Sequence, residues 1–353
     1  MRGACIDRSA RRQQEEVTIL TRAGPDGSSG AYSIEIGDVG RNGEDFLRFC
    51  LAWLPGYSRD RFTKYFERNP LGDPEFVLAR SADGQVVGVA ALHPQQVLVD
   101  GEAQAAAVAG DFAVEESRRG FGPALAMQRM LVSRLDARGW SFAYGLPNKA
   151  ASAVTRRVGY RELAPFRRLS RVLTRSERVV AALGGDPVRR ATRDRSIQRA
   201  SAFDGRFEAI WAAAGKRAAY VPAPGASLLN WRYELSPSPS HRFSLTVAAV
   251  GGAIAAYSVA TVAYGRRTVV ELGWLDDVSL RAVVAAELRR AARERLGGVD
   301  LLYLGRPQHL APALTPLGFV ESRAPAVVVY PSQAGQRVGD PDRWLLFEGA
   351  TDI

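Results

Sequence analysis

The stretch EESRRGFGPAL (residues 115–125) places two glycines one residue apart, directly after two arginines. The stretch before it, AVAGDFAV (107–114), is apolar except for Asp111 and predicts a buried strand. The stretch after it, ALAMQRMLVSRL (124–135), carries leucines and methionines at helical spacing and predicts a helix. A glycine turn between a strand and a helix N-terminus points backbone N–H groups at an anion. The sequence therefore predicts an anion site at this junction.

The composition is that of a globular protein. The chain has 353 residues, of which 46% are hydrophobic and 24% charged, and this length favours two domains. Its two cysteines and three histidines are scattered, so we expect neither a disulfide framework nor a metal site. The opening stretch MRGACIDRSARRQQEE lacks the apolar segment of a signal peptide, which together with the cysteine content favours a cytoplasmic location.

The chain is strongly basic, with a formal net charge of +10 and a pI near 10. A solvated, arginine-rich surface explains such a charge, and so does attraction to an acidic partner such as nucleic acid, anionic lipid or a polyphosphate cofactor. No RNA-binding or helix-turn-helix signature stands out, which makes nucleic acid an unlikely partner.

One uncharged stretch, residues 243–265, is long enough to span a bilayer. Gly251 and Gly252 lie near its centre, between FSLTVAAV and AIAAYSVATVAY. Two β-rich runs around a Gly-Gly pair predict a hairpin, so we expect no membrane span here.

The order of predicted elements occurs twice. A mixed sheet followed by strand, helix, strand and helix predicts an α/β unit over residues 31–173, and the same order returns loosely over 196–332. We predict two tandem α/β domains, each a mixed, mostly antiparallel sheet flanked by helices. Residues 174–195 are predicted as a linker, 1–30 as a flexible segment and 333–353 as a C-terminal tail.

The first copy resembles the GNAT family of acyl-CoA N-acyltransferases. That family has a glycine loop of the form Q/R-x-x-G-x-G/A between its fourth strand and third helix, and SRRGFG (117–122) matches it at Gly120 and Gly122. The family also has an Asn that opens the following helix and a GY or GF pair after it, which Asn148 and VGY (158–160) match. The leading Gln or Arg of the loop is replaced here by a serine.

The resemblance implies a site for acyl-coenzyme A. In the family, the loop binds the pyrophosphate at the helix N-terminus, and the pantetheine arm runs between the splayed fourth and fifth strands. Arginines after the strand would add charge-assisted contacts, and a solvated turn is the alternative for them. The implied cofactor-binding residues are Phe112, Ala113, Val114, Arg118, Arg119, Gly120, Phe121, Gly122, Pro123, Ala124, Leu146 and Asn148.

Acyl transfer to an amine needs a group that takes the amine proton. Asp111 is the only acid in the apolar strand and is predicted to be this base, with a hydrogen-bonded structural role as the alternative. The family's usual tyrosine acid falls on Thr155. Tyr144 and Tyr160 are the predicted substitutes, with core packing as their alternative.

The second copy resembles the same fold without its glycine pair. The equivalent junction reads LGWLDDVSLRAV (272–283), in which Asp276 and Asp277 would repel a pyrophosphate. We therefore expect this copy to retain the fold, to lack the cofactor site and to form one wall of the acceptor site. The candidate wall residues are Trp231, Arg232 and Tyr233, with core packing and an inter-domain ion pair as the alternatives.

The predicted function is transfer of an acyl group, expected to be acetyl, from coenzyme A to an amine on a small molecule or an amino sugar, without a metal. One alternative is a peptidyl-type transferase that uses aminoacyl-tRNA, which the basic charge favours and the glycine loop disfavours. The other is a non-catalytic acyl-CoA-binding or scaffold protein, which the missing tyrosine favours.

Overall fold

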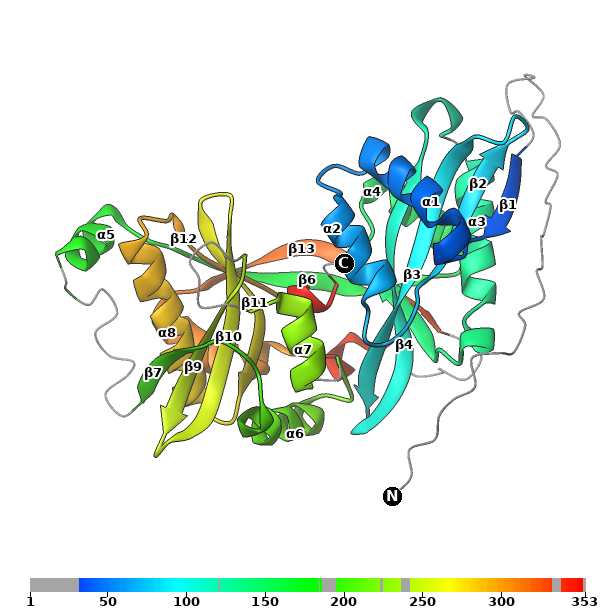
Figure 1. Cartoon of the computed structure of the whole chain (residues 1–353). Coiled ribbons are helices and arrows are strands. Elements are labelled where there is room, and N and C mark those ends of the chain that lie inside the picture. The colour runs from blue at the N-terminus through cyan, green and yellow to red at the C-terminus, as the bar shows by residue number, and fades with distance from the viewer. Residues whose placement is uncertain are drawn as a thin grey trace.

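The computed structural model describes residues 32–119, 121–183, 185, 195–222, 225–235, 242–331 and 338–351. The predicted flexible segment at 1–30 and the loop residue Gly120 lie outside these described residues. A single mixed sheet of 14 strands runs through the described part of the chain, with helices packed against it (Figure 1). The α/β class predicted from the sequence is confirmed.

The first half begins with three antiparallel strands and two helices, followed by a long fourth strand. Its strands are β1 (Tyr32–Ile36), β2 (Glu75–Ser81), β3 (Val86–Val99), β4 (Glu102–Val114), β5 (Phe142–Gly145) and β6 (Arg161–Val172). Its helices are α1 (Val39–Trp53), α2 (Arg59–Phe62) with a π-helical turn over Thr63–Glu67, α3 (Phe121–Ser133) and α4 (Lys149–Val158).

Alternation along β2 explains why helices cover both faces of this half. Successive side chains of a strand point to opposite faces. Accordingly, Phe76 and Leu78 pack in the cluster formed by α1 and α2, while Val77 and Ala79 pack in the cluster formed by α3. Beside these strands lie β4 and β5, which contain the predicted site; on β5, Phe142 and Tyr144 pack with Tyr220 and Trp344 instead of with α1 and α2.

The second half follows the same plan. Its strands are β7 (Ser196–Ala200), β8 (Tyr220–Pro222), β9 (Ser244–Val250), β10 (Ala253–Ala263), β11 (Arg266–Trp274), β12 (Gly298–Leu304), β13 (Val320–Pro331) and β14 (Leu346–Phe347). Its helices are α6 (Glu208–Arg217), α7 (Ala226–Tyr233), α8 (Asp277–Arg293) and α9 (Ala311–Leu314), and α5 (Arg175–Ala182) lies within the predicted linker.

The predicted hairpin at Gly251 and Gly252 is confirmed. β9 and β10 pair antiparallel on either side of the two glycines, both of which have positive φ angles, +54° and +87°. Such angles suit residues without a Cβ. No helix in the described part of the chain is long and apolar enough to cross a bilayer.

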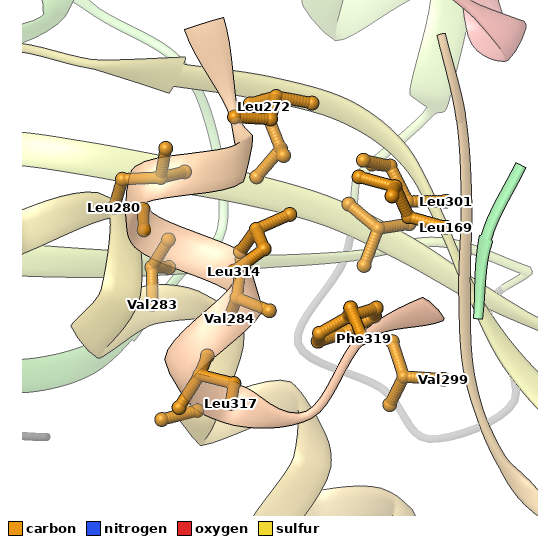
Figure 2. Packing of buried hydrophobic residues seen from close by; sticks show 14 of the residues in the cluster. Leu169, Leu272, Leu280, Val283, Val284, Val299, Leu301, Leu314, Leu317 and Phe319 are labelled. Atoms are coloured by element: carbon orange, nitrogen blue, oxygen red, sulfur yellow. The ribbon is translucent and has the colours of Figure 1, made fainter. Parts of the chain in front are cut away.

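The two halves of the sheet exchange their last strands. The strand order is β1-β2-β3-β4-β5-β13-β6-β12-β11-β10-β9-β7, so β13 completes the first half and β6 completes the second. Each half is antiparallel except for one parallel pair, β4 with β5 and β11 with β12. The cores are interlocked as a result: Leu169 of β6 packs with Leu301 in the second core, as Figure 2 shows, and Val328 of β13 packs in the first.

Candidate active site

The strands β4 and β5 diverge at the position that the resemblance predicts. They pair in parallel only at Ala107 with Ala143 and at Val108 with Tyr144. Beyond this point β4 continues to Val114, whereas β5 ends one residue after Tyr144. The edge of β4 that faces β5 is therefore without a strand partner beyond Val108 within the described sheet, which leaves its backbone groups able to bind a ligand.

A β-bulge lies in β4 beside this divergence. Val89 of β3 is opposite Ala113 and Ala91 is opposite Gly110, so β4 has one more residue than β3 over this interval. Asp111 lies in the bulge with a φ angle of +47°. Left-handed backbone is uncommon for residues other than glycine, although Asp tolerates it better than most. Bulges often re-aim side chains next to active sites, and here the aimed side chain is a carboxylate.

The loop after β4 leads directly into α3. It forms a short 3₁₀ turn over Glu116–Arg118, and α3 begins at Phe121. Arg118 and Arg119 form ion pairs with the glutamates three residues before them, at 3.8 and 3.3 Å. Surface pairs of this kind contribute only about 0–1 kcal/mol, so either arginine can exchange its glutamate for a phosphate at little cost.

The protein itself leaves room for a side chain at one of the two loop glycines. A Cβ on Gly122 would lie 3.4 Å from the hydroxyl of Tyr32, an ordinary van der Waals distance. Gly122 is exposed at the start of α3, whereas Pro123 and Ala124 are buried in the first turn. Close approach of a pyrophosphate to the backbone is therefore the predicted reason for a glycine at Gly120 and at Gly122, and it stays a prediction from the sequence pattern.

The remaining predicted cofactor residues lie on both sides of the divergence. Because β4 and β5 are parallel, the loop after β4 and the segment after β5 leave the sheet at the same end. Phe112, Ala113 and Val114 form the end of β4. Leu146 follows β5 and is half-buried, and Asn148 caps α4, its Oδ1 accepting the Ala151 N–H at 2.9 Å. The side chain of Phe121 is not among those described.

Asp111 is held in a buried polar network that the sequence did not reveal. Nη2 of Arg61 donates to Oδ1 of Asp111 at 3.0 Å, and Nε2 of His93 lies 3.0 Å from Oδ2. The Tyr57 hydroxyl donates to the same Oδ2 at 3.4 Å. The Asp111 side chain is only 2% exposed. Burial alone would raise the pKa of Asp111, but the hydrogen bonds and charges of His93 and Arg61 outweigh burial and lower that pKa.

The network explains why Asp111 carries its charge in a buried position. An ionised carboxylate is tolerated inside a protein when cations and donors satisfy its oxygens. Burial and the Asp111 charge raise the pKa of Tyr57, which keeps its hydroxyl protonated as a donor. Any proton transfer to Asp111 therefore requires one of these contacts to give way.

The two predicted tyrosines differ in their distance along the sheet from the divergence. Tyr144 lies at the last β4–β5 pair, is fully buried and donates its hydroxyl to the Ala350 carbonyl at 3.3 Å. Tyr160 lies in the core beneath α3 against Tyr330, and its hydroxyl has no partner among the described residues. Burial raises the pKa of both. Tyr144 is thus the better placed of the two.

The predicted wall residues Trp231, Arg232 and Tyr233 lie at the junction of the two halves. Arg232 is buried, and its Nη2 donates to Oε1 of Gln95 on β3 at 2.7 Å. The Tyr233 hydroxyl donates to Oε2 of Glu271 at 2.9 Å. The indole of Trp231 packs edge-on against the ring of Tyr65, with 5.4 Å between ring centroids. α7 therefore joins the second half to β3 and to the π-helical turn after α2 in the first half.

A pocket of about 260 Å³ opens at this junction. Arg61 of α2 lines it together with Lys64 and Tyr65 of the π-helical turn that follows. Arg232 and Tyr233 line it from α7. The remaining lining residues are Gly56, Ser58, Asp60, Glu234, Arg242, Phe243 and Gly349. Because Arg61 contacts both this pocket and Asp111, the pocket adjoins the polar network at the bulge. Among the described residues, no group of three or more His, Cys, Asp or Glu side chains is placed to hold a metal ion.

The C-terminal segment occupies the corresponding divergence in the second half. β11 and β12 pair only from Arg267 with Val299 to Val269 with Leu301. Beyond this, β14 pairs with the end of β12, and a Cβ on Gly349 would lie 2.8 Å from the Val270 carbonyl oxygen. The chain itself thus fills the space that remains beside β4 in the first half.

Comparisons with known proteins agree with this geometry. Residues 49–163 match the sequence profile of a family described as acetyltransferase (GNAT) domain. A comparison with curated protein sequences finds no match.

Solved structures extend the similarity over most of the chain. A probable N-acyltransferase from Enterococcus faecalis has a TM-score of 0.62 and 15% identity, covering 86% of this chain and 73% of its own. A GCN5-related N-acetyltransferase from Kribbella flavida has a TM-score of 0.59 and 17% identity, covering 85% and 71%. The N-myristoyltransferase of Saccharomyces cerevisiae, with bound myristoyl-CoA, has a TM-score of 0.54 and 11% identity, covering 91% and 89%. The chain therefore has the α/β fold of GNAT-like N-acetyltransferases, and its first half contains a segment that matches the GNAT acetyltransferase domain.

Proposed function

We propose that this protein transfers an acyl group, acetyl in the first instance, from coenzyme A to the amine of a small molecule or amino sugar. The observation that carries the proposal is the bulge at Asp111 beside the divergence of β4 and β5, with the SRRGFG loop leaving the sheet at the same end. An unpaired strand edge, a helix N-terminus and a carboxylate are thereby brought together in one region of the first half.

The loop and the two strand ends are assigned to the cofactor. The backbone at the start of α3, with Arg118 and Arg119, would hold the pyrophosphate, since helix N-termini and guanidinium groups both favour phosphate oxygens. The free edge of β4 over residues 112–114 would hydrogen-bond the pantetheine arm. Leu146 and Asn148 would flank that arm from the β5 side.

Acyl transfer from a thioester requires attack by a neutral amine, loss of a proton from that nitrogen and departure of a thiolate. Asp111 is proposed to accept the proton, directly or through a water, because it is a buried carboxylate that immediately precedes the proposed cofactor-binding edge. Tyr144 is proposed as the donor to the thiolate in preference to Tyr160, since it lies where the strands diverge. Acyl-CoA itself supplies the activated carbonyl carbon.

The junction pocket is assigned to the acceptor. Arg61 lines this pocket and also contacts Asp111, so the pocket adjoins the proposed base. Its volume of about 260 Å³ suits a small amine. Arg232 and Tyr233 line this pocket. The indole of Trp231 packs edge-on against Tyr65, which also lines it.

Release of free thiol from acetyl-CoA, measured with a panel of amines and amino sugars, tests the proposal. Acceptor-dependent release supports acyl transfer. Binding of acetyl-CoA without release under any acceptor supports the non-catalytic alternative. Release that requires aminoacyl-tRNA supports the peptidyl-type alternative.

We expect Asp60→Trp to raise the acceptor KM at least about tenfold, equivalent to a loss of roughly 1.4 kcal/mol in binding free energy. Asp60 is exposed at the start of α2 and lines the pocket, so an indole there would occupy the space of the acceptor. Steady-state kinetics with the best acceptor of the panel gives the measurement.

Glu67→Trp provides the matched control, because Glu67 is exposed in the same helical segment but is not part of the pocket lining. Both variants should bind coenzyme A like the wild type. An unchanged acceptor KM in Asp60→Trp would place the acceptor elsewhere.

A further inference from the structure

A groove of about 770 Å³ lies between β7 and α8, at the end of the molecule away from β1 (Figure 1). β7 is the last strand in the sheet order. Among the described residues that line the groove are five arginines and one carboxylate, Glu294. The arginines are Arg195, Arg199, Arg289, Arg290 and Arg293. A helix laid on a sheet ordinarily buries apolar residues, so this concentration of one charge calls for a physical reason.

Strand geometry places two of the arginines on one face. Arg195 immediately precedes β7 and Arg199 lies within it, with Ile197 between them. Residues two apart along extended backbone point the same way, so these three side chains face the groove together. All three line it.

Helix geometry likewise places the groove residues of α8 on one face of the helix. Ala286, Arg289, Arg290 and Arg293 have the spacing i, i+3, i+4 and i+7, which forms one stripe along a helix. All four line the groove. The two periodicities therefore bring arginines from a strand and a helix to face one another.

Within the described part of the chain, the one carboxylate of the groove is shared between two arginines. Nε of Arg290 lies 2.8 Å from Oε1 of Glu294, but Oε2 of the same glutamate is already 3.2 Å from Nη1 of Arg267. Nη1 of Arg290 is buried and has no hydrogen-bond partner among the described residues. Arg195 is paired with Asp276 at 3.5 Å, and Arg289 also has an interaction partner. One glutamate thus serves two arginines, and a buried guanidinium N–H is left for another acceptor.

The charges on the two sides of the groove are close enough to affect each other. Burial lowers the pKa of Arg199, and the positive charges of Arg290 and Arg267 lower it further. Like charges brought together in this way repel, and an anion between them removes the repulsion.

We propose that this groove binds a small molecule that carries a chain of phosphate groups. Guanidinium groups present paired N–H donors that match phosphate oxygens. The volume falls in the range of small-molecule sites, roughly 300–1,000 Å³. Several arginines around one hollow match adjacent phosphates, whereas a nucleic acid strand needs a basic track that follows its backbone. A nucleoside triphosphate and inorganic polyphosphate share this chemistry.

The test is titration calorimetry of sodium tripolyphosphate into the full chain saturated with coenzyme A. Arg199→Gln/Arg293→Gln removes two charges whose side chains are exposed, so we expect it to fold normally. Arg48→Gln/Arg68→Gln removes the same charge from exposed positions of the first half. We expect one tripolyphosphate to bind per chain, with equal affinity for the wild type and the control. Its affinity for the groove variant should be at least tenfold lower. Affinity should also fall as salt rises.

Repeating the titration with ATP in place of tripolyphosphate distinguishes a nucleotide from a free polyphosphate as the ligand. Tighter binding of ATP indicates a nucleotide, and equal binding indicates recognition of the phosphates alone; both support the proposal. Absence of binding to the wild type at millimolar tripolyphosphate, or equal affinity in the wild type and the groove variant, would overturn it. Tighter binding of a single-stranded oligonucleotide, lost in the groove variant, would also overturn it in favour of nucleic acid.

Discussion

Replacing Asp111 by Asn is expected to lower the rate of acyl transfer by about 10²–10⁴-fold, the usual contribution of a positioned general base. Asn keeps the size of the side chain and one acceptor oxygen but has no basic oxygen to take the amine proton. The affinity for coenzyme A should change little, because the assigned phosphate contacts come from the loop after β4. Thiol release gives the rate, and calorimetry gives the affinity for coenzyme A.

The same substitution should also destabilise the fold, because it removes the carboxylate from a buried network. Arg61 and His93 would each lose a charged acceptor, and unsatisfied buried groups cost about 1–3 kcal/mol. Urea unfolding of the wild type and the variant measures this cost. Asp136→Asn, at an exposed position, is the matched control and should leave both stability and rate unchanged.

The pH dependence of stability distinguishes loss of the Asp111 charge from a general loss of packing. The pKa of Asp111 is lower in the folded chain than its ordinary value of 3.8. The charge therefore stabilises the fold at neutral pH, and this contribution disappears as the pH falls below about 3.8 towards the folded pKa. The difference in stability between wild type and Asp111→Asn should shrink over that range. A variant with wild-type turnover would reassign Asp111 to a purely structural role.

Removing both loop arginines, by Arg118→Gln/Arg119→Gln, is expected to weaken coenzyme A binding by roughly ten- to a hundredfold. Each charge-assisted hydrogen bond contributes about 1.5–3 kcal/mol, reduced here by the glutamate contacts that the arginines must release. Gly120→Val should weaken binding at least tenfold by the steric argument given above.

The control for the loop is Arg48→Gln/Arg68→Gln, which changes the net charge equally. If both arginine pairs weaken binding by the same factor, the effect is one of overall charge and the loop is not the site.

Local sequence patterns predicted much of the fold. Helical spacing, strand alternation and the Gly251-Gly252 turn predicted elements that the structure contains, because periodicity and turn chemistry depend on neighbouring residues. The exchange of β6 and β13 was not predicted, since strand pairing between residues such as Val328 and Gly145 leaves no local signal. Nor did the sequence predict that residues 346–350 fill the second divergence.

The same distinction between local and long-range features applies to the candidate site. The loop and Asp111 could be found because they fall within one strand-turn-helix unit. Arg61 and His93 could not, because they meet Asp111 from positions 50 and 18 residues away. A lone histidine within the apolar run of β3 was the only signal of a buried polar partner. The acceptor-wall hypothesis for Arg232 and Tyr233 remains a prediction, although both line the junction pocket.

Titration of acetyl-CoA into the wild-type chain, read by native mass spectrometry, tests the central claim most directly. The first half has an open strand edge with a glycine loop beside it, whereas the second half has Asp276 and Asp277 at the equivalent junction and its own C-terminal segment in the gap. The account predicts one acetyl-CoA per chain, displaced by coenzyme A and weakened in Arg118→Gln/Arg119→Gln. No bound acetyl-CoA, or two per chain, would contradict it.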